Sequence, residues 1–328
     1  MSESNHTSAS VGFVHLHLHS EYSLRDGLIR LKPLVKRAAE LNMPAVAVTD
    51  LDNLFAAVKF YKGALEAGVK PILGCDLAFR SADTEAGICR VVLLAMSATG
   101  YRNLSNLITA AYRHQQPGEL PMVDRDWMDD WSTDLIAISA GLHGDVGQVL
   151  MAGKQTEAQR LLDGWLRTFG DRFYLGVSRT GRPNEERCLQ ATCDLAIGND
   201  VPVVAGNDVR FLVSEDFEAH EARVCIHEGR SLADPRRPRL YSEQQYLRSP
   251  EEMRVLFADL PGALQNSVEI ARRCNVELQL GKNFLPEFPV PAGQTVEQEL
   301  EQQSRAGLER RLSKLFQGRP EALQAARP

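Results

Sequence analysis

The sequence of 328 residues lacks the features that mark several specialised classes of protein. It has no run approaching the roughly 18 apolar residues of a membrane-spanning helix. Its first twelve residues are small and polar, so no signal peptide is expected. None of its six cysteines forms a Cys-x-x-Cys pair. We therefore expect the reduced, mostly buried thiols of a cytoplasmic protein.

Basic residues are also in the minority. The chain has 37 Lys and Arg against 43 Asp and Glu, which gives a formal net charge of −6. Such a chain is not a generic binder of polyanions, and any contact with nucleic acid must come from a local basic patch. With 44% hydrophobic and 24% charged residues, the composition is that of an ordinary globular protein with more than one domain.

Histidines are concentrated near the start of the chain. Three of the eight, His15, His17 and His19, alternate with apolar residues over positions 14–19, a pattern typical of a β-strand. In a strand, the three imidazoles would share one face. With Asp26 beyond a turn, they form half of a metal site. A strand whose polar face carries histidines by chance is the alternative, and the clustering favours the metal site.

Short apolar stretches alternate with segments of helical periodicity, which argues for an α/β fold with parallel strands. Strands are predicted at about 13–18, 44–50, 70–76, 90–95, 135–139, 173–177 and 201–205. Helices are predicted at about 28–42, 53–67, 101–113, 155–169, 184–198, 215–229, 251–258, 262–274 and 295–316. Seven strands of this kind fit a barrel better than an open sheet.

Acidic residues follow several of the predicted strands. Asp50, Asp76 and Asp208 each stand at a strand's carboxyl end, where a barrel builds its active site. A single Asp at such a position is explained as well by a helix N-cap. Together with Asp26 and the histidines, the three acids predict a shared site.

These residues resemble a known family, the PHP (polymerase and histidinol phosphatase) domain. The motifs are His17-Leu-His19, Asp26-Gly27, Thr49-Asp50, Gly74-Cys-Asp76 and Asn207-Asp208. Longer stretches, such as Gly100-Tyr-Arg-Asn-Leu104 and Val268-Glu-Ile-Ala-Arg-Arg-Cys-Asn275, are similar to the N-terminal region of bacterial DNA polymerase III alpha subunits. The resemblance covers about residues 13–315.

The resemblance implies a distorted seven-stranded (β/α) barrel followed by the start of a polymerase palm. Residues 1–11 are expected to be a disordered N-terminus and 12–282 a PHP domain. Residues 283–328 are expected to be a connector and the truncated beginning of the palm region. The proline-rich stretch around 283–289 is a plausible boundary.

Complete PHP sites bind a cluster of divalent metals, Zn²⁺ or Mn²⁺, and hydrolyse phosphoesters. The resemblance places the ligands on His17, His19, Asp26, Asp50, Asp76 and Asp208. Four other ligand positions are replaced, by Leu51, Arg90, Gly141 and Arg210. Guanidinium groups at two of them can neutralise the remaining acids without an ion. We expect no full cluster; a single weakly held ion on His17, His19 and an acid stays open.

Two further features have open interpretations. His143 follows the replaced Gly141 closely and either substitutes as a ligand or is an exposed loop residue. Arg236, Arg237 and Arg239, interleaved with prolines, are either phosphate contacts or an exposed loop paired with acids of the same protein. We favour the second interpretation in both cases.

The resemblance implies that the intact subunit extends DNA from deoxynucleoside triphosphates with Mg²⁺. No Asp follows Asp259 in this chain, so the catalytic aspartates of nucleotidyl transfer are not expected in it. This portion would then serve as a scaffold that docks the proofreading exonuclease (epsilon) subunit. DNA and the other replisome subunits would be reached through the intact chain. The alternatives are a residual metal-dependent phosphoesterase, of 3′-exonuclease or pyrophosphatase type, and a histidinol-phosphatase-like enzyme, which would leave residues 213–315 unexplained.

Overall fold

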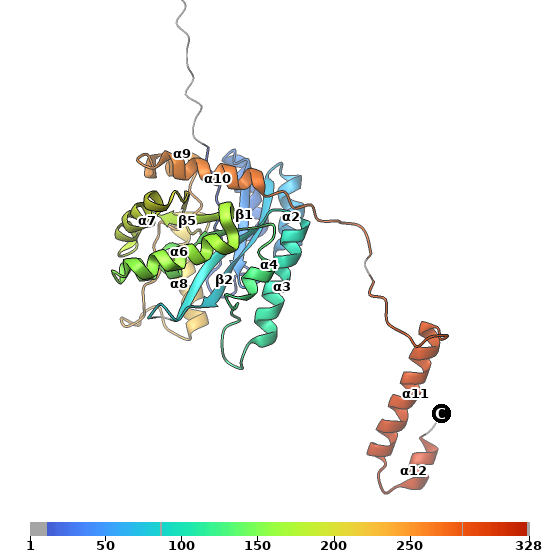
Figure 1. Cartoon of the computed structure of the whole chain (residues 1–328). Coiled ribbons are helices and arrows are strands. Elements are labelled where there is room, and N and C mark those ends of the chain that lie inside the picture. Colours follow the sequence, from blue (N-terminus) through green and yellow to red (C-terminus); the bar gives the residue numbers. More distant parts are fainter. Residues whose placement is uncertain (1–11, 86, 284, 327–328) are drawn as a thin grey trace, which may run out of the picture. The chain divides into compact units, whose positions relative to one another are not determined.

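A computed structural model describes residues 12–85, 87–283 and 285–326 of the chain (Figure 1). The expected disordered start, residues 1–11, lies outside the described residues. The chain divides into two compact units, one ending at Leu278 and the other beginning at Gln279. Each unit is described by itself.

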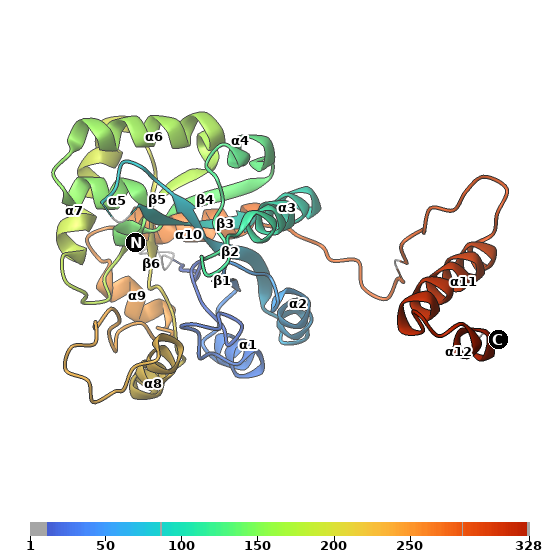
Figure 2. The same ribbon diagram turned by 90° about the horizontal axis from the view of Figure 1, so that it is seen from below.

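The first unit is built on one mixed sheet of six strands in the order β1-β2-β3-β4-β5-β6. The strands are β1 (Ala45–Leu51), β2 (Lys70–Arg80), β3 (Ile88–Ala95), β4 (Leu135–Ser139), β5 (Phe173–Ser178) and β6 (Val203–Gly206). In Figure 2 the strands follow one another around a curve, and α10 (Pro261–Arg273) lies inside it. The sheet is therefore a curled half-barrel.

The expected all-parallel sheet is wrong at β3. This strand pairs antiparallel with both β2 and β4, whereas the other pairs in the sheet are parallel. Only residues 81–87 connect β2 to β3. A parallel connection needs a crossover of a dozen residues or more, so this short link forces a hairpin.

The expected seventh strand, at 13–18, does not form a regular strand in the described part of the chain. Its carbonyls at His15 and Leu18 accept hydrogen bonds from β1 at 2.9 Å, but these residues are three apart. A parallel ladder bonds every second residue, so no regular ladder forms. On its other side, the His19 N–H donates to the Val209 carbonyl at 2.9 Å. The segment thus links β1 to the residues that follow β6.

Helices surround the sheet, and α10 lies on its inner side. In the first unit they are α1 (Leu31–Glu40), α2 (Ala57–Glu66), α3 (Ala98–His114), α4 (Trp127–Trp131), α5 (Asp145–Met151), α6 (Gln155–Phe169), α7 (Glu185–Asn199), α8 (Phe217–Glu228), α9 (Pro250–Leu256) and α10. Each predicted helix overlaps an observed one. The short α4 and α5 were not predicted, because fewer than three turns leave too little periodicity to detect.

The two faces of the sheet bury different side chains. Val92 and Leu94 of β3 cluster with Ile270 of α10 on the inner face. Val91 and Leu93 cluster with residues of α1, α2, α3 and α6 on the outer face. This period of two is what a strand buried on both faces requires. All six cysteines are free and buried, as predicted.

The second unit contains α11 (Val296–Leu315) and α12 (Pro320–Ala325). A capping box between Thr295 and Gln298 begins α11, because each side chain accepts from the other residue's backbone N–H. Leu300 and Leu315 are 66% and 73% exposed. No helix in the described parts of either unit has the length and hydrophobicity needed to cross a bilayer.

Gly147 of α5 tests the packing next to the sheet. A Cβ on Gly147 would lie 2.0 Å from the Gly141 carbonyl oxygen, whereas one on Gly198 of α7 would meet nothing within 4 Å. Gly147→Ala should therefore lower the free energy of unfolding by about 1–3 kcal/mol, as overpacking does. The control Gly198→Ala should leave it unchanged or raise it by up to about 1 kcal/mol. Urea unfolding followed by circular dichroism measures both, and equal stabilities would contradict the packing described.

Candidate functional site

The sheet's register brings acids and a cation to one edge. Leu51 of β1 pairs with Asp76 of β2, and Arg90 of β3 pairs with Ala78 two residues further along β2. Because β3 runs antiparallel, its beginning lies at the edge where β1 and β2 carry their acids. That edge borders a cleft of about 310 Å³, lined by residues that include Asp76 and Arg90.

Two histidines and an acid form a compact group in the cleft. Ligand atoms of His17, His19 and Asp76 all lie within 4.8 Å of one another. The Nε2 atoms of His17 and His19 are 3.0 and 3.2 Å from the same oxygen, Asp76 Oδ2. His19 Nδ1 is 2.8 Å from Asp26 Oδ1, and His17 Nδ1 is 3.3 Å from Asp208 Oδ1. The residues present thus make a possible His/Asp metal site.

The Arg90 guanidinium contacts the same acid from the other side. Its Nε donates to Asp76 Oδ1 at 2.8 Å, and its Nη2 donates to the Asp76 carbonyl at 2.6 Å. The same Nη2 is 3.3 Å from Asp52 Oδ1. Arg90 therefore neutralises Asp76 and Asp52, at a position where the resemblance to PHP domains predicts a replaced ligand.

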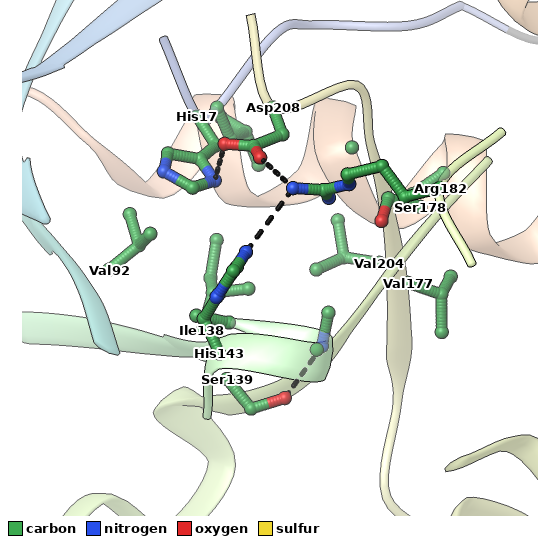
Figure 3. A pocket seen from close by; sticks show the side chains of 16 residues that line it. His17, Val92, Ile138, Ser139, His143, Val177, Ser178, Arg182, Val204 and Asp208 are labelled. Carbon is green, nitrogen blue, oxygen red and sulfur yellow. Dashed lines mark hydrogen bonds and ion pairs between the residues drawn. The ribbon is translucent and has the colours of Figure 1, made fainter. Parts of the chain in front are cut away.

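Two more arginines converge on Asp208. Arg210 Nη2 is 2.5 Å from Asp208 Oδ1, and its Nε is 3.3 Å from Asp26 Oδ2. Arg182 Nη1 donates to Asp208 Oδ2 at 2.8 Å and lies 3.2 Å from His143 Nε2. Figure 3 shows the resulting chain of side chains from His17 through Asp208 and Arg182 to His143. His143 is exposed, but it belongs to a short 3-10 helix (Gly141–His143) and lines the cleft, so its role as a ligand stays a hypothesis.

Asp50 is bound differently from the other acids. It is 1% exposed and accepts from the Ser20 N–H at 2.6 Å and from the Ser20 and Ser23 hydroxyls at 2.7 Å each. Burial raises the pKa of Asp50, and these hydrogen bonds oppose that rise. Its carboxylate holds the turn after His19 in place.

Charge compensation keeps Asp76 and Asp208 ionised. Burial alone would raise the pKa of Asp76, but Arg90 and the two imidazoles hold it well below its usual range. Burial is likewise outweighed at Asp208, where Arg210 and His17 lower the pKa. Burial and Arg210 oppose protonation of His19, yet its pKa is raised, because Asp26 and Asp76 face its two ring nitrogens. The cluster is therefore balanced by its own charges.

A full metal cluster does not fit this arrangement. Guanidinium groups engage one oxygen of Asp76 and both oxygens of Asp208, and serine donors engage both oxygens of Asp50. Leu51, which lines the cleft, offers no donor atom. Among the described residues, the nitrogens of His17 and His19 and the remaining Asp76 oxygen are the ligand atoms that converge where one ion could bind.

The remaining predicted residues lie elsewhere. The prediction that three imidazoles share one face is wrong for His15, whose Nε2 is 2.8 Å from the Arg248 carbonyl and which packs against Phe13. It fails because the segment is not a regular strand. Gly141 lines a smaller pocket beside the cleft.

The three loop arginines do not belong to the described lining of the cleft. Arg237 pairs with Glu221, and Arg236 is 3.2 Å from Asp234. Arg239 is exposed. The pairing of two of the three with acids of the same protein fits the interpretation favoured from the sequence.

Several site residues were missed from the sequence. Asp52 follows Asp50 by two positions, which was a usable signal. Arg182, on the loop before α7, carried none. Gln245 donates to Asp208 Oδ2 at 2.9 Å, and the Tyr241 hydroxyl donates to Asp26 Oδ2 at 3.2 Å. The first contact joins residues 37 apart and the second joins residues 215 apart, and periodicity reveals neither.

Comparisons with known proteins agree on the family. A family model described as the PHP domain matches residues 15–180. The chain is 53% identical over 308 residues to DNA polymerase III subunit alpha of Pseudomonas aeruginosa and 47% identical over 312 residues to that of Escherichia coli K12. The alignments cover 94% and 95% of this chain but only 26% and 27% of those proteins. The chain thus spans about a quarter of the length of the curated relatives it matches.

A solved amidohydrolase from Chromobacterium violaceum, with bound sulfate and no metal, aligns with a TM-score of 0.41 and 14% identity. The alignment covers 64% of this chain and 96% of that chain. A structural likeness of this size carries no argument about function.

Arg210 tests the charge balance. Arg210→Met would leave Asp26 and Asp208 buried with less compensation, so we expect a loss of about 3 kcal/mol in the free energy of unfolding. Arg272→Met removes a surface salt bridge with Glu269, in which the Arg272 and Glu269 side chains are 71% and 45% exposed. This substitution should lower the free energy of unfolding by no more than about 1 kcal/mol. Adding Asp208→Asn to Arg210→Met should recover part of the loss. Equal urea midpoints for the two arginine variants would refute the balance described.

Proposed function

The chain belongs to the PHP domain family, and we propose that it forms the N-terminal part of a bacterial replicative DNA polymerase alpha subunit. In this proposal the PHP domain is a structural scaffold, and its metal site is degenerate. It braces the following palm region and docks the proofreading exonuclease subunit. The high identity to alpha subunits over nearly the whole chain supports the first part of the proposal.

The observation that carries the scaffold role is the pairing of guanidinium groups with the acids at ligand positions. Arg90 binds Asp76, and Arg210 binds Asp208, at 2.8 and 2.5 Å. A phosphoesterase of this family would use a metal cluster to activate water and to stabilise charge on the phosphoryl oxygens. With arginines on these carboxylates, the cluster lacks the free donor atoms it needs.

DNA synthesis belongs to the intact subunit in this proposal. It would extend DNA with Mg²⁺ bound by aspartates outside this chain, since no Asp follows Asp259 here. DNA and the other replisome subunits would be partners of the whole subunit. The relatives' shared name supports this assignment.

A second candidate is a residual phosphoesterase that uses one ion. The observation in its favour is the convergence of His17, His19 and Asp76, with ligand atoms within 4.8 Å. Zn²⁺ or Mn²⁺ would suit two imidazoles and a carboxylate. These three side chains now hydrogen-bond to one another, so an ion would have to displace those contacts.

Metal content separates the two candidates. After incubation with Zn²⁺ or Mn²⁺ and desalting, the purified chain should retain well below one equivalent of metal by elemental analysis. The double variant His17→Ala/His19→Ala should retain the same amount of metal as the unchanged chain. The unchanged chain should also hydrolyse bis-p-nitrophenyl phosphate no faster than buffer alone does. One equivalent that the double variant loses would favour the second candidate. Roughly two or three equivalents would indicate an intact cluster and overturn the proposed degeneracy.

A variant with restored ligands is the positive control for this measurement. The variant carries four substitutions, Leu51→His, Arg90→His, Gly141→Cys and Arg210→His. Each of them puts a metal ligand where the unchanged chain has a cation or a residue without a donor side chain. It should retain more metal than the unchanged chain, because the freed oxygens of Asp76 and Asp208 become available.

The docking role is tested with the purified exonuclease subunit of the same replisome. The immobilised chain should retain that subunit at about 0.15 M salt, where long-range charge attraction is screened beyond roughly 8 Å. An unrelated protein of similar net charge is the control. Loss of retention by the folded chain would remove the docking role while leaving the family assignment intact.

A further inference from the structure

A groove with an apolar floor runs between α1 and α2 on the first unit. Its volume is about 1050 Å³. Leu31, Val35 and Ala39 line it from α1, and Phe55 and Val58 line it from the α2 side. The α1 residues recur every four positions and therefore form one stripe along the helix. The groove shares no lining residue with the described lining of the His/Asp cleft.

Part of this apolar surface faces solvent. Phe55 is 63% exposed and Val58 is 50% exposed, whereas Leu31 and Val35 beneath them are buried. Large apolar side chains gathered in one exposed groove, with a charged rim, are typical of a surface that a partner covers. An aromatic side chain in such a position is a common anchor of binding energy.

Lysines form both rims of the groove. Lys32 and Lys36 of α1 and Lys59 and Lys62 of α2 line it, each pair at helical spacing. Among the described residues, these four lysines make one salt bridge, between Lys36 and Glu40 at 3.8 Å. The side chains of Lys36 and Glu40 are 78% and 48% exposed. Such an exposed pair contributes little.

The rim charge does not balance within the groove. Glu40 and Glu66, each the last residue of its helix, are the acids that line it. Four lysines against two glutamates leave a formal charge of +2 in a chain whose net charge is −6. A partner that fills the groove would therefore gain from acidic residues beside its apolar face.

We propose that this groove binds an acidic amphipathic α-helix of a partner protein. A helix of ten residues such as α1 is about 15 Å long, so the groove offers room for two to three turns. Apolar residues at i, i+3 or i+4, and i+7 would fill the floor between α1 and α2. Asp or Glu on the flanks of that helix would face the lysines.

Other occupants fit the groove less well. A second copy joined groove to groove would bring the lysine rims together, and like charges oppose that pairing. The rim lysines could contact phosphates and Phe55 could stack on a base, but the aliphatic floor of Leu31 and Val35 matches the apolar face of a helix better than a polyanion. Binding of such a helix does not depend on whether the exonuclease docks on this chain.

Selection of peptides on the whole chain tests the proposal. A displayed library of helix-forming peptides, with all positions of one face varied, is selected on the chain and counter-selected on Val58→Asp. The recovered sequences should carry apolar residues at helical spacing and an excess of Asp and Glu. Recovery of neutral or basic helices, or of no sequence that distinguishes the two proteins, would overturn the proposal.

Matched variants locate the binding. Val58 and Leu65 are both on α2 and are 50% and 53% exposed, but only Val58 lines the groove. A selected peptide, labelled with fluorescein, should bind Val58→Asp at least about tenfold more weakly and Leu65→Asp with unchanged affinity. Lys36→Glu/Lys62→Glu should weaken it as well, and Lys154→Glu, on an exposed site outside the groove, should not. Equal losses in the groove variants and their controls would refute the location.

Two further measurements separate the other occupants. Sedimentation should give the same mass for the unchanged chain and Val58→Asp; a dimer that Val58→Asp abolishes would assign the groove to a second copy. A labelled single-stranded oligonucleotide should not compete with the peptide. Competition that depends on Lys36 and Lys62 but not on Val58 would assign the rims to nucleic acid and overturn the proposal.

Discussion

The first unit depends on the compensation of buried carboxylates by buried guanidinium groups. An isolated ionised carboxylate in a protein interior is too costly to persist, and it either loses its charge or finds a partner. Here Asp76 is paired with Arg90, and Asp208 is paired with Arg182 and Arg210, all at 2.5–2.8 Å. In a metal-binding relative the ions would supply this charge. In this chain arginine side chains supply the compensating positive charge, so the carboxylates can stay ionised at any metal concentration.

The same contacts hold distant parts of the chain together. The segment that carries His17 and His19 has only irregular hydrogen bonds to β1, so it gains little from the sheet itself. Its histidines contact Asp76 of β2 and Asp208 after β6. A network of this kind gives a half-barrel a fixed edge, which suits the proposed scaffold role. The network's specificity comes from geometry, since each guanidinium must meet its carboxylates in plane.

The groove and the charge network are separate features of one unit. The network buries its charges, and the groove between α1 and α2 exposes apolar and basic side chains to solvent. Changes to one should therefore leave the other intact. The proposed roles of the two regions, internal bracing and binding of a helical partner, can be removed independently.

The sequence alone determined the nine predicted helices, six of the seven predicted strands and the residues His17, His19 and Asp76, because these follow from periodicity and local spacing. It also indicated that Arg90 and Arg210 could neutralise acids. Only the tertiary structure decided which acids they meet, that Asp50 binds serines and that His15 lies outside the site. Those outcomes depend on partners far along the chain, such as Arg182 with Asp208 and Tyr241 with Asp26. A buried charge is satisfied by whichever group the fold brings within about 3 Å, and that distance is not encoded in local sequence.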